Sequence, residues 1–193
     1  VYKRQTYNAS QGKPAYAAII NRLDRPVSGL VLIAKNKSAA AKYSTLMQKE
    51  GGFNKQYEAL ICGKLSELKG TFVDYLKKDG RTNTSAIVPA DSAANDKEAK
   101  LSKLEYEVIS YDEVKDITHV RIHLITGRHH QIRVQFASRR HPLVGDYKYA
   151  TADCGMDNAV KAVALKRNQI ALCAVSLTVD NKTYSVAPEF SIG

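Results

Sequence analysis

Short runs in which apolar and polar residues alternate recur along the chain and restrict its fold strongly. In residues 118–125, the apolar side chains Val120, Ile122 and Leu124 alternate with polar ones. Successive side chains of a strand point to opposite faces, so this run predicts a strand with one buried face. The other predicted strands are 29–34, 55–63, 71–76, 104–111, 169–179 and 183–186. The last two flank a short turn, and together the runs predict a largely antiparallel sheet.

Two segments carry helix signals instead. Residues 38–49 begin with Ser38, a residue type that caps helix N-termini, and Gly51 follows their end. Residues 128–140 place two apolar side chains four positions apart, with arginines elsewhere around the axis. We therefore expect a second helix there, basic and amphipathic.

The predicted elements fit one domain. The 193 residues are 44% hydrophobic, which is enough for a core. Residues 81–100 lack a sustained period and indicate an exposed connection. The pattern predicts an α+β fold, a mostly antiparallel mixed sheet with flanking helices, in a single domain over residues 1–193. Because the chain begins with Val1 and opens without a clear period, we expect that it lacks an N-terminal portion.

Compartment and cysteine usage exclude several classes of protein. The sequence has neither an apolar run of about 18 residues nor a secretory signal, so we expect a cytoplasmic protein that does not enter membranes. Cys62, Cys154 and Cys173 are odd in number and lack paired spacing, which argues against disulfides and a structural zinc site. We expect three reduced thiols and a monomer.

The charge balance indicates a polyanionic partner. Lys and Arg total 29 against 19 Asp and Glu, which gives a net charge of +10 and a pI near 9.5. Nucleic-acid binders, proteins of anionic membranes and merely soluble basic domains share this balance, so charge alone does not identify the partner.

Asp24 is the first candidate for chemistry. It lies between Arg22 and Arg25, in a proline-containing loop directly before the apolar run 29–34. Neighbouring cations favour an ionised carboxylate, and a rigid loop at a strand end can hold it toward a cleft as a nucleophile or base. The alternative is a surface salt bridge, which is common among loop residues of this kind.

The segment 126–133 (TGRHHQIR) is the second candidate, at the junction of a predicted strand and helix. Arg128 could pair with a carboxylate in the cleft, while Arg133 and nearby cations could contact phosphates. The alternative is a solvated helix face. His129 and His130 could indicate a metal site, but adjacent side chains diverge and no third ligand is spaced suitably.

Three blocks of the sequence resemble a known family. The stretches NRLDRPVSGLVLIAK (21–35), KQYEALICG (55–63) and TGRHHQIRVQFASRRHPLVGD (126–146) are similar, in order and spacing, to the signature blocks of the RluA-type pseudouridine synthases. The resemblance covers about residues 17–180. It implies a bent, mostly antiparallel mixed sheet with an RNA-binding cleft, and enzymatic conversion of uridine to pseudouridine without metal or other cofactor.

The resemblance also implies roles for individual residues. Asp24 would be the catalytic aspartate, and Arg22 would occupy the space left in the RNA by the flipped uridine. Tyr57 would stack on the flipped base and help to remove the C5 proton late in the reaction; the alternative is a tyrosine that packs in a strand. Leu172 would line the uracil pocket, and core packing explains it equally well. Arg128 would form the ion pair that orients Asp24.

The expected partner is structured RNA, either ribosomal or transfer RNA. The expected RNA-binding residues are Arg22, Arg25, Arg133, Arg139 and Arg140. Two positions depart from the family pattern, where Asn21 and Gln135 replace histidines; both retain hydrogen-bonding groups. The strand that normally comes first in the family and an S4-like domain are not expected in this sequence.

Two other functions are compatible with the same residues. A catalytically silent RNA-binding module would bind RNA in a salt-sensitive way without turnover. An Asp-dependent nucleoside or glycoside hydrolase would need a second carboxylate acting as general acid, which the sequence does not supply convincingly.

Overall fold

The structure is a computed structural model that describes residues 16–49, 52–163, 165–166 and 168–192. Its main element is an eight-stranded sheet with the order β10-β9-β4-β8-β7-β5-β6, in which β2 also pairs with β9. These strands are β2 (Ser28–Gly29), β4 (Asn54–Cys62), β5 (Lys69–Asp79), β6 (Thr84–Val88), β7 (Lys100–Asp112), β8 (Ile117–Leu124), β9 (Leu172–Val179) and β10 (Lys182–Ser185). Apart from the parallel β2–β9 pair, the pairings in this sheet are antiparallel.

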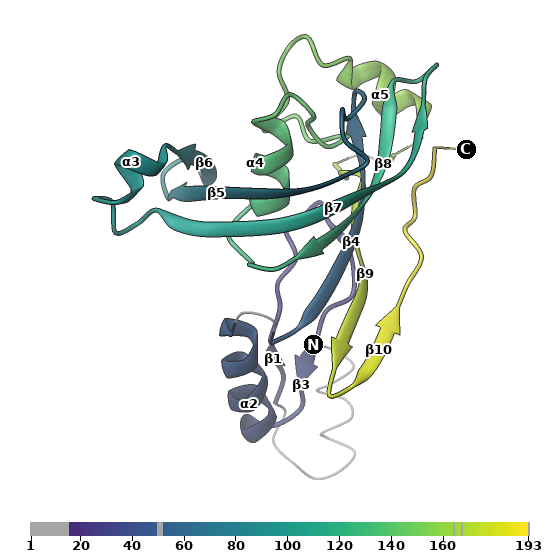
Figure 1. The fold of residues 1–193 in the computed structure, drawn as a ribbon. Coiled ribbons are helices and arrows are strands. Elements are labelled where there is room, and N and C mark those ends of the chain that lie inside the picture. Colours follow the sequence, from purple (N-terminus) through teal and green to yellow (C-terminus); the bar gives the residue numbers. More distant parts are fainter. Residues whose placement is uncertain (1–15, 50–51, 164, 167, 193) are drawn as a thin grey trace.

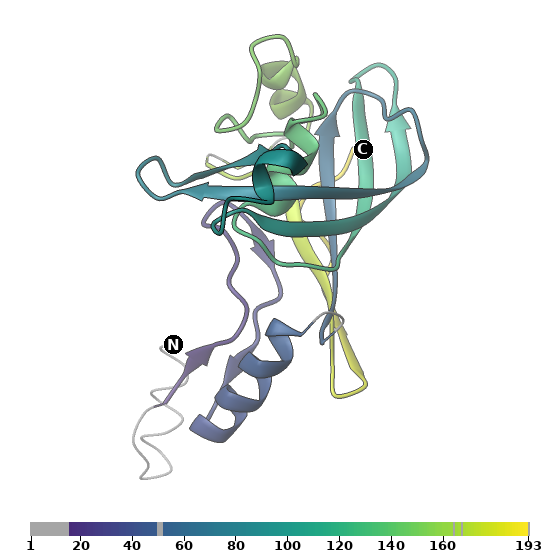
Figure 2. The same ribbon diagram turned by 60° about the vertical axis from the view of Figure 1, so that its left-hand side comes forward.

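The remaining elements lie around this sheet. They are the two-stranded sheet of β1 (Ala18–Ile19) and β3 (Ile33–Ala34), and the helices α2 (Lys37–Gln48), α3 (Ala90–Ala93), α4 (Gln131–Ala137) and α5 (Met156–Ala162). The sheet is strongly bent, and β5 runs across the direction of β4 and β9 (Figure 1). Helix α2 and the β1–β3 pair lie at one end of β4 and β9, and α5 lies at the other end (Figures 1 and 2). None of the described helices is long and apolar enough to cross a membrane.

The C-terminal part of β4, residues 59–62, is buried on both faces. Ile61 belongs to the core cluster that contains Phe136 of α4, whereas its neighbour Leu60 belongs to the cluster that contains Met156 of α5. Both Leu60 and Ile61 are fully buried. A strand covered on both faces needs consecutive apolar residues, which explains why the alternation in β4 ends in a continuous apolar run. The α+β class and the antiparallel strands expected from the sequence are confirmed.

The apolar run 29–34 is not the buried strand that its composition predicts. Ser28 and Gly29 pair with β9, whereas Ile33 and Ala34 pair with β1 in the other sheet. The chain passes from one sheet to the other between these pairs, so Ile33 remains 39% exposed. A short apolar run does not reveal whether one partner strand or two will pair with it.

The first helix begins with a different cap from the predicted one. Asn36, and not Ser38, is the N-cap, and its Oδ1 accepts a hydrogen bond from the Ala39 N–H at 2.8 Å. Both are capping residue types, and sequence alone does not separate them. The expectation for Gly51 lies outside the described residues.

Two further expectations need correction. Residues 81–100 contain β6 and α3 in addition to connecting turns. The basic amphipathic helix predicted over 128–140 is the shorter α4, and its residues 131–136 are all buried. Two polar side chains of α4, those of Arg133 and Gln135, have specific partners described below, so this helix does not present a solvated basic face.

Candidate active site

The loop that carries Asp24 is held at several points. A turn closes between Asp24 and Val27, whose N–H donates to the Asp24 carbonyl at 2.9 Å. Across the base of the loop, the buried Asn21 side chain donates to the Leu30 carbonyl (3.1 Å) and accepts from the Leu32 N–H. Asn21 therefore fixes the loop. Its amide, at a position where the family resemblance led us to expect histidine, has a structural role.

The same loop is anchored on β9 through Gly29. This residue has φ +115°, a conformation that favours glycine, and a Cβ added to it would lie 2.4 Å from the Ala174 carbonyl oxygen. The Leu30 N–H donates to that carbonyl at 3.0 Å. Because β2 lies this close to β9, the position of Asp24 is set by the edge of the main sheet.

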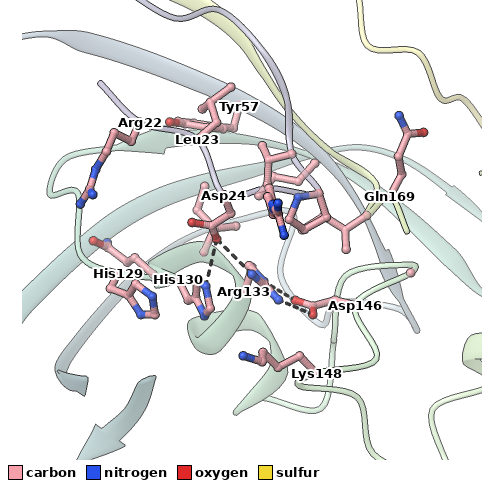
Figure 3. A pocket seen from close by; sticks show the side chains of 18 of the residues that line it. Arg22, Leu23, Asp24, Tyr57, His129, His130, Arg133, Asp146, Lys148 and Gln169 are labelled. Atoms are coloured by element: carbon pink, nitrogen blue, oxygen red, sulfur yellow. Dashed lines mark hydrogen bonds and ion pairs between the residues drawn. The ribbon is translucent and has the colours of Figure 1, made fainter. Parts of the chain in front are cut away.

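Asp24 forms an ion pair with Arg133. The Arg133 Nη1 donates to the Asp24 Oδ2 at 3.1 Å, while Nε and Nη2 each donate to Asp146 at 2.7 Å (Figure 3). The side chains of Arg133 and Asp146 are 6% and 1% exposed, whereas that of Asp24 is 30% exposed. The two-point contact with Asp146 fixes the guanidinium plane, and Arg133 then orients a carboxylate that still faces the cavity.

The prediction that Arg128 orients Asp24 is therefore wrong. The Arg128 side chain is exposed, and its Nε donates to the Leu101 carbonyl at 2.9 Å. The expectation that Arg133 meets RNA phosphates is also wrong, because Arg133 is buried between two carboxylates. Sequence spacing places both arginines near the start of one helix, but only packing shows which of them turns inward.

His130 is a further neighbour of Asp24. From the sequence it is considered only as a metal ligand, and it is given no catalytic or RNA-binding role. Its Nε2 lies 3.6 Å from the Asp24 Oδ2, and its Nδ1 lies 2.7 Å from the Tyr149 hydroxyl. That hydroxyl accepts from the Ser85 N–H at 2.9 Å, so its own proton is available for His130 Nδ1. We assign the imidazole proton to Nε2, which faces Asp24.

Electrostatics support a neutral His130. Burial, followed by the nearby Arg133 charge, lowers the pKa of His130 from 6.5 to about 4. The ring stacks on His129, with 3.7 Å between the ring centroids. His129 Nδ1 in turn lies 2.9 Å from the Ser85 hydroxyl oxygen. The paired histidines thus support Asp24, and the described residues contain no group of three side chains that could hold a metal.

A cavity of about 1130 Å³ joins these residues to most of the others that the sequence singled out. Asp24, Tyr57 and Leu172 all line it, and Tyr57 lies beside Asp24 in Figure 3. Tyr57 is 8% exposed, and burial followed by the Asp24 charge raises its pKa to about 12. The protonated phenol of Tyr57 and the apolar side chain of Leu172 therefore line the same cavity as the Asp24 carboxylate.

The wall of this cavity is strongly cationic. Asp24 and Asp146, both paired with Arg133, are the acidic residues among the described residues that line it. The other cationic lining residues are Arg22, Arg25, Lys55, Lys78, Arg128, Lys148 and Lys166. The cavity is therefore suited to an anionic ligand.

Two of the predicted RNA-binding arginines do not line this cavity. Arg139 pairs with Asp74, with 3.0 Å between Nη1 and Oδ2, and its guanidinium lies 4.0 Å from the Phe72 ring centroid. Arg140 is exposed elsewhere. Gln135, the second departure from the family pattern, is fully buried and donates to Asp74 at 2.7 Å. Asp74 thus connects β5 with the end of α4, and this cluster serves packing.

The comparisons with known proteins give the family and agree with this fold. Residues 2–138 match the family described as RNA pseudouridylate synthase. The chain therefore belongs to the RNA pseudouridylate synthase family.

Individual relatives give the same assignment. Over 137 residues the chain is 37% identical to ribosomal large subunit pseudouridine synthase D of Blochmanniella floridana, a match covering 69% of this chain and 38% of that protein. Over 177 residues it is 31% identical to the protein of the same name from Vibrio vulnificus, covering 90% and 51%. The chain thus spans about half or less of these curated relatives.

Solved structures share the fold. Human RNA pseudouridylate synthase domain containing 1 superimposes with a TM-score of 0.70 at 24% identity, covering 90% of this chain and 69% of that one. Human RNA pseudouridylate synthase domain containing 4 gives a TM-score of 0.74 at 18% identity, covering 96% and 76%. The bent mixed sheet is therefore that of pseudouridine synthase structures.

Proposed function

We propose that this chain converts uridine in RNA to pseudouridine, with Asp24 as the catalytic carboxylate. The observation that carries the proposal is the placement of Asp24 in a cation-lined cavity, ion-paired with Arg133 and beside the buried ring of Tyr57. Family membership supplies the reaction class. Since the relatives described above are named for the ribosomal large subunit, we propose large-subunit rRNA as the first substrate to test, with transfer RNA second. The proposed setting is the cytoplasm.

The chemistry is an isomerisation that balances within the nucleotide. The bond from uracil N1 to ribose C1′ breaks, and a bond from C5 to C1′ forms. C5 then loses a proton, and N1 gains one. No electrons are exchanged with a second reactant. The reaction needs a reactive group near the ribose, here the Asp24 carboxylate, and a site that retains the detached base.

The cavity residues divide this work. Asp24 either attacks the ribose or removes a ribose proton, and Arg133 keeps it oriented. The flipped uracil stacks on Tyr57 with Leu172 at its edge, which retains the base after the glycosidic bond breaks. Because the Tyr57 pKa is about 12, this phenol is protonated near neutral pH, and stacking is its first role. Arg22 is exposed and lines the cavity, which supports the proposal that it fills the space left in the RNA stack by the flipped uridine.

Mapping of pseudouridine in cellular RNA tests the proposal. In a strain lacking the gene, at least one discrete uridine should remain unmodified, and the wild-type chain should restore it. Asp24→Asn should fail to restore it while remaining folded by circular dichroism. Lys69→Met, on an exposed pair with Glu107 outside the cavity, is the control and should restore it. RNA binding without any modified site would favour the silent RNA-binding module, and free uracil would favour the hydrolase.

A further inference from the structure

Among the described residues, Lys55 is a buried cation without an anionic partner. It lies in β4 and is 9% exposed. The Lys55 Nζ contacts the Met47 sulfur at 3.8 Å and pairs with no carboxylate of the described residues. Burial lowers its pKa, with no charged group opposing the shift. Arg133, the other buried cation of the cavity, has two carboxylates by comparison.

The ammonium group of Lys55 opens onto the cavity. Lys55, Met47 and Gly127 all line it. A Cβ added at Gly127 would lie 3.5 Å from the Lys55 Nζ, so the missing side chain at Gly127 leaves the ammonium uncovered. Lys55 and Tyr57 are two residues apart on the same buried face of β4. That spacing is about 7 Å along a strand.

An unpaired buried ammonium destabilises the folded protein unless a ligand neutralises it. A compact ammonium with three donors is matched by a phosphate oxygen. Because a phosphodiester is anionic and uracil is uncharged, neutralisation of Lys55 favours the RNA backbone over the base as its ligand.

We propose that Lys55 binds a phosphodiester oxygen of the RNA strand beside the uridine that stacks on Tyr57. The inference rests on the proposed function for the orientation of the strand. It assigns Lys55 an RNA-binding role, whereas Arg133, which the sequence suggested for phosphate contact, has an internal one. The unpaired charge of Lys55 lowers the stability of the free protein, and RNA binding offsets this loss.

The test uses Lys55→Met, which keeps the length of the side chain and removes its charge. Binding is measured by fluorescence anisotropy with a short fluorescein-labelled oligouridylate over a series of KCl concentrations, in the Asp24→Asn background. Loss of one phosphate contact should reduce the slope of log affinity against log salt by about 0.7. Lys55→Arg should retain the slope, and Lys69→Met is the matched control.

Three measurements separate binding from folding. Lys55→Met should melt at the same temperature as its parent or higher, because an uncompensated buried charge has been removed. Gly127→Leu, which leaves Lys55 in place but covers its Nζ, should show the same reduction of the salt slope. Replacement of single phosphates by uncharged methylphosphonates should weaken binding at one position for the parent and not for Lys55→Met.

An unchanged affinity and slope in Lys55→Met would overturn the inference, as would weaker binding with an unchanged slope, which indicates contact with an uncharged group such as a uracil carbonyl. A reduced slope in a chain that forms no pseudouridine supports the phosphate site while refuting the proposed function. Pseudouridine formation by the wild-type chain, together with an unchanged salt slope in Lys55→Met, would support the proposed function and refute the phosphate site.

Discussion

At the scale of single residues, the buried Arg133 depends on Asp146 for its position. Asp146 is 1% exposed and takes two of the guanidinium's hydrogen bonds, which leaves Nη1 for Asp24. Removal of one charge from a buried pair costs about 3–5 kcal/mol, because the remaining charge stays buried. Asp146→Asn should therefore lower the free energy of unfolding by about this amount and should slow pseudouridine formation.

Urea denaturation followed by circular dichroism measures this loss. Asp157→Asn is the control, since Asp157 is exposed and accepts only from the Tyr147 hydroxyl among the described residues. Equal urea midpoints for Asp146→Asn and wild type would show that Asp146 does not hold Arg133.

The neutral state of His130 makes stability depend on pH. Its pKa is about 4 in the folded protein against 6.5 without the fold, mainly because of burial and the Arg133 charge, with Asp24 opposing. Between these values the unfolded chain binds more protons, so the free energy of unfolding should fall as pH falls from 6.5 toward 4. His129, whose pKa burial also lowers, contributes in the same direction.

The difference between wild type and His130→Gln isolates this contribution. The variant should lose less stability than wild type over the same pH range in urea titrations, whereas His123→Gln, at an exposed position, should follow wild type. Parallel curves for wild type and His130→Gln would contradict a buried neutral His130.

The candidate site could be predicted only in part from single residues. Asp24 and Tyr57 stand in recognisable sequence patterns, and both line the cavity. The choice of Arg128 over Arg133 was wrong because the sequence does not show which arginine is buried. His130 acts on Asp24, which is far away in the chain, and Asp146 contacts Arg133 across a turn after α4; local spacing shows neither contact.

At the scale of elements, the parallel contact of β2 with β9 positions the Asp24 loop. Gly29→Ala would force a Cβ to within 2.4 Å of the Ala174 carbonyl at φ +115°. Such strain costs about 1–3 kcal/mol or is relieved by moving the loop. We expect a lower melting temperature together with reduced pseudouridine formation.

Gly80→Ala is the matched control for this variant. A Cβ at Gly80 meets no atom within 4 Å, so this substitution should leave both quantities unchanged. If Gly29→Ala behaved like Gly80→Ala in both assays, the contact of β2 with β9 would not position Asp24.

Elements were predictable where periodicity extends over many residues. The alternation over 118–125 identified β8, and the run over 55–63 identified β4. The two-residue strands β2 and β3 carry too little pattern, and their partners lie in different sheets. The spacing of its apolar residues predicts an amphipathic α4 with a solvated basic face, whereas in the structure its residues 131–136 are all buried. Periodicity does not distinguish polar residues with buried partners from a solvated face.

At the scale of the whole molecule, the two sides of the sheet differ in charge. Among the described residues, the cations that line the cavity outnumber its acids, although Arg133 and Lys166 are paired, whereas on the outer face Glu58 contacts His119 and Arg121, and Lys69 pairs with Glu107. The excess of cations around the cavity has the sign that an anionic ligand requires.

Charge reversal should therefore affect RNA binding on one side only. Arg22→Glu, at the cavity, should weaken binding of the labelled oligouridylate and reduce its salt dependence, whereas Lys69→Glu should do neither. Equal effects of the two substitutions on the dissociation constant would indicate diffuse attraction rather than a bound strand.

The role of Asp24 is tested most directly by tritium release from RNA labelled at uridine C5. Large-subunit rRNA from a strain lacking the gene is incubated with excess purified protein, so that a single turnover is followed. We predict that the wild-type chain releases tritium from a discrete site and that Asp24→Asn, folded and able to bind the same RNA, is slower by about 10²–10⁴-fold or more. Tritium release by Asp24→Asn at the wild-type rate would contradict the assignment of Asp24 as the catalytic carboxylate.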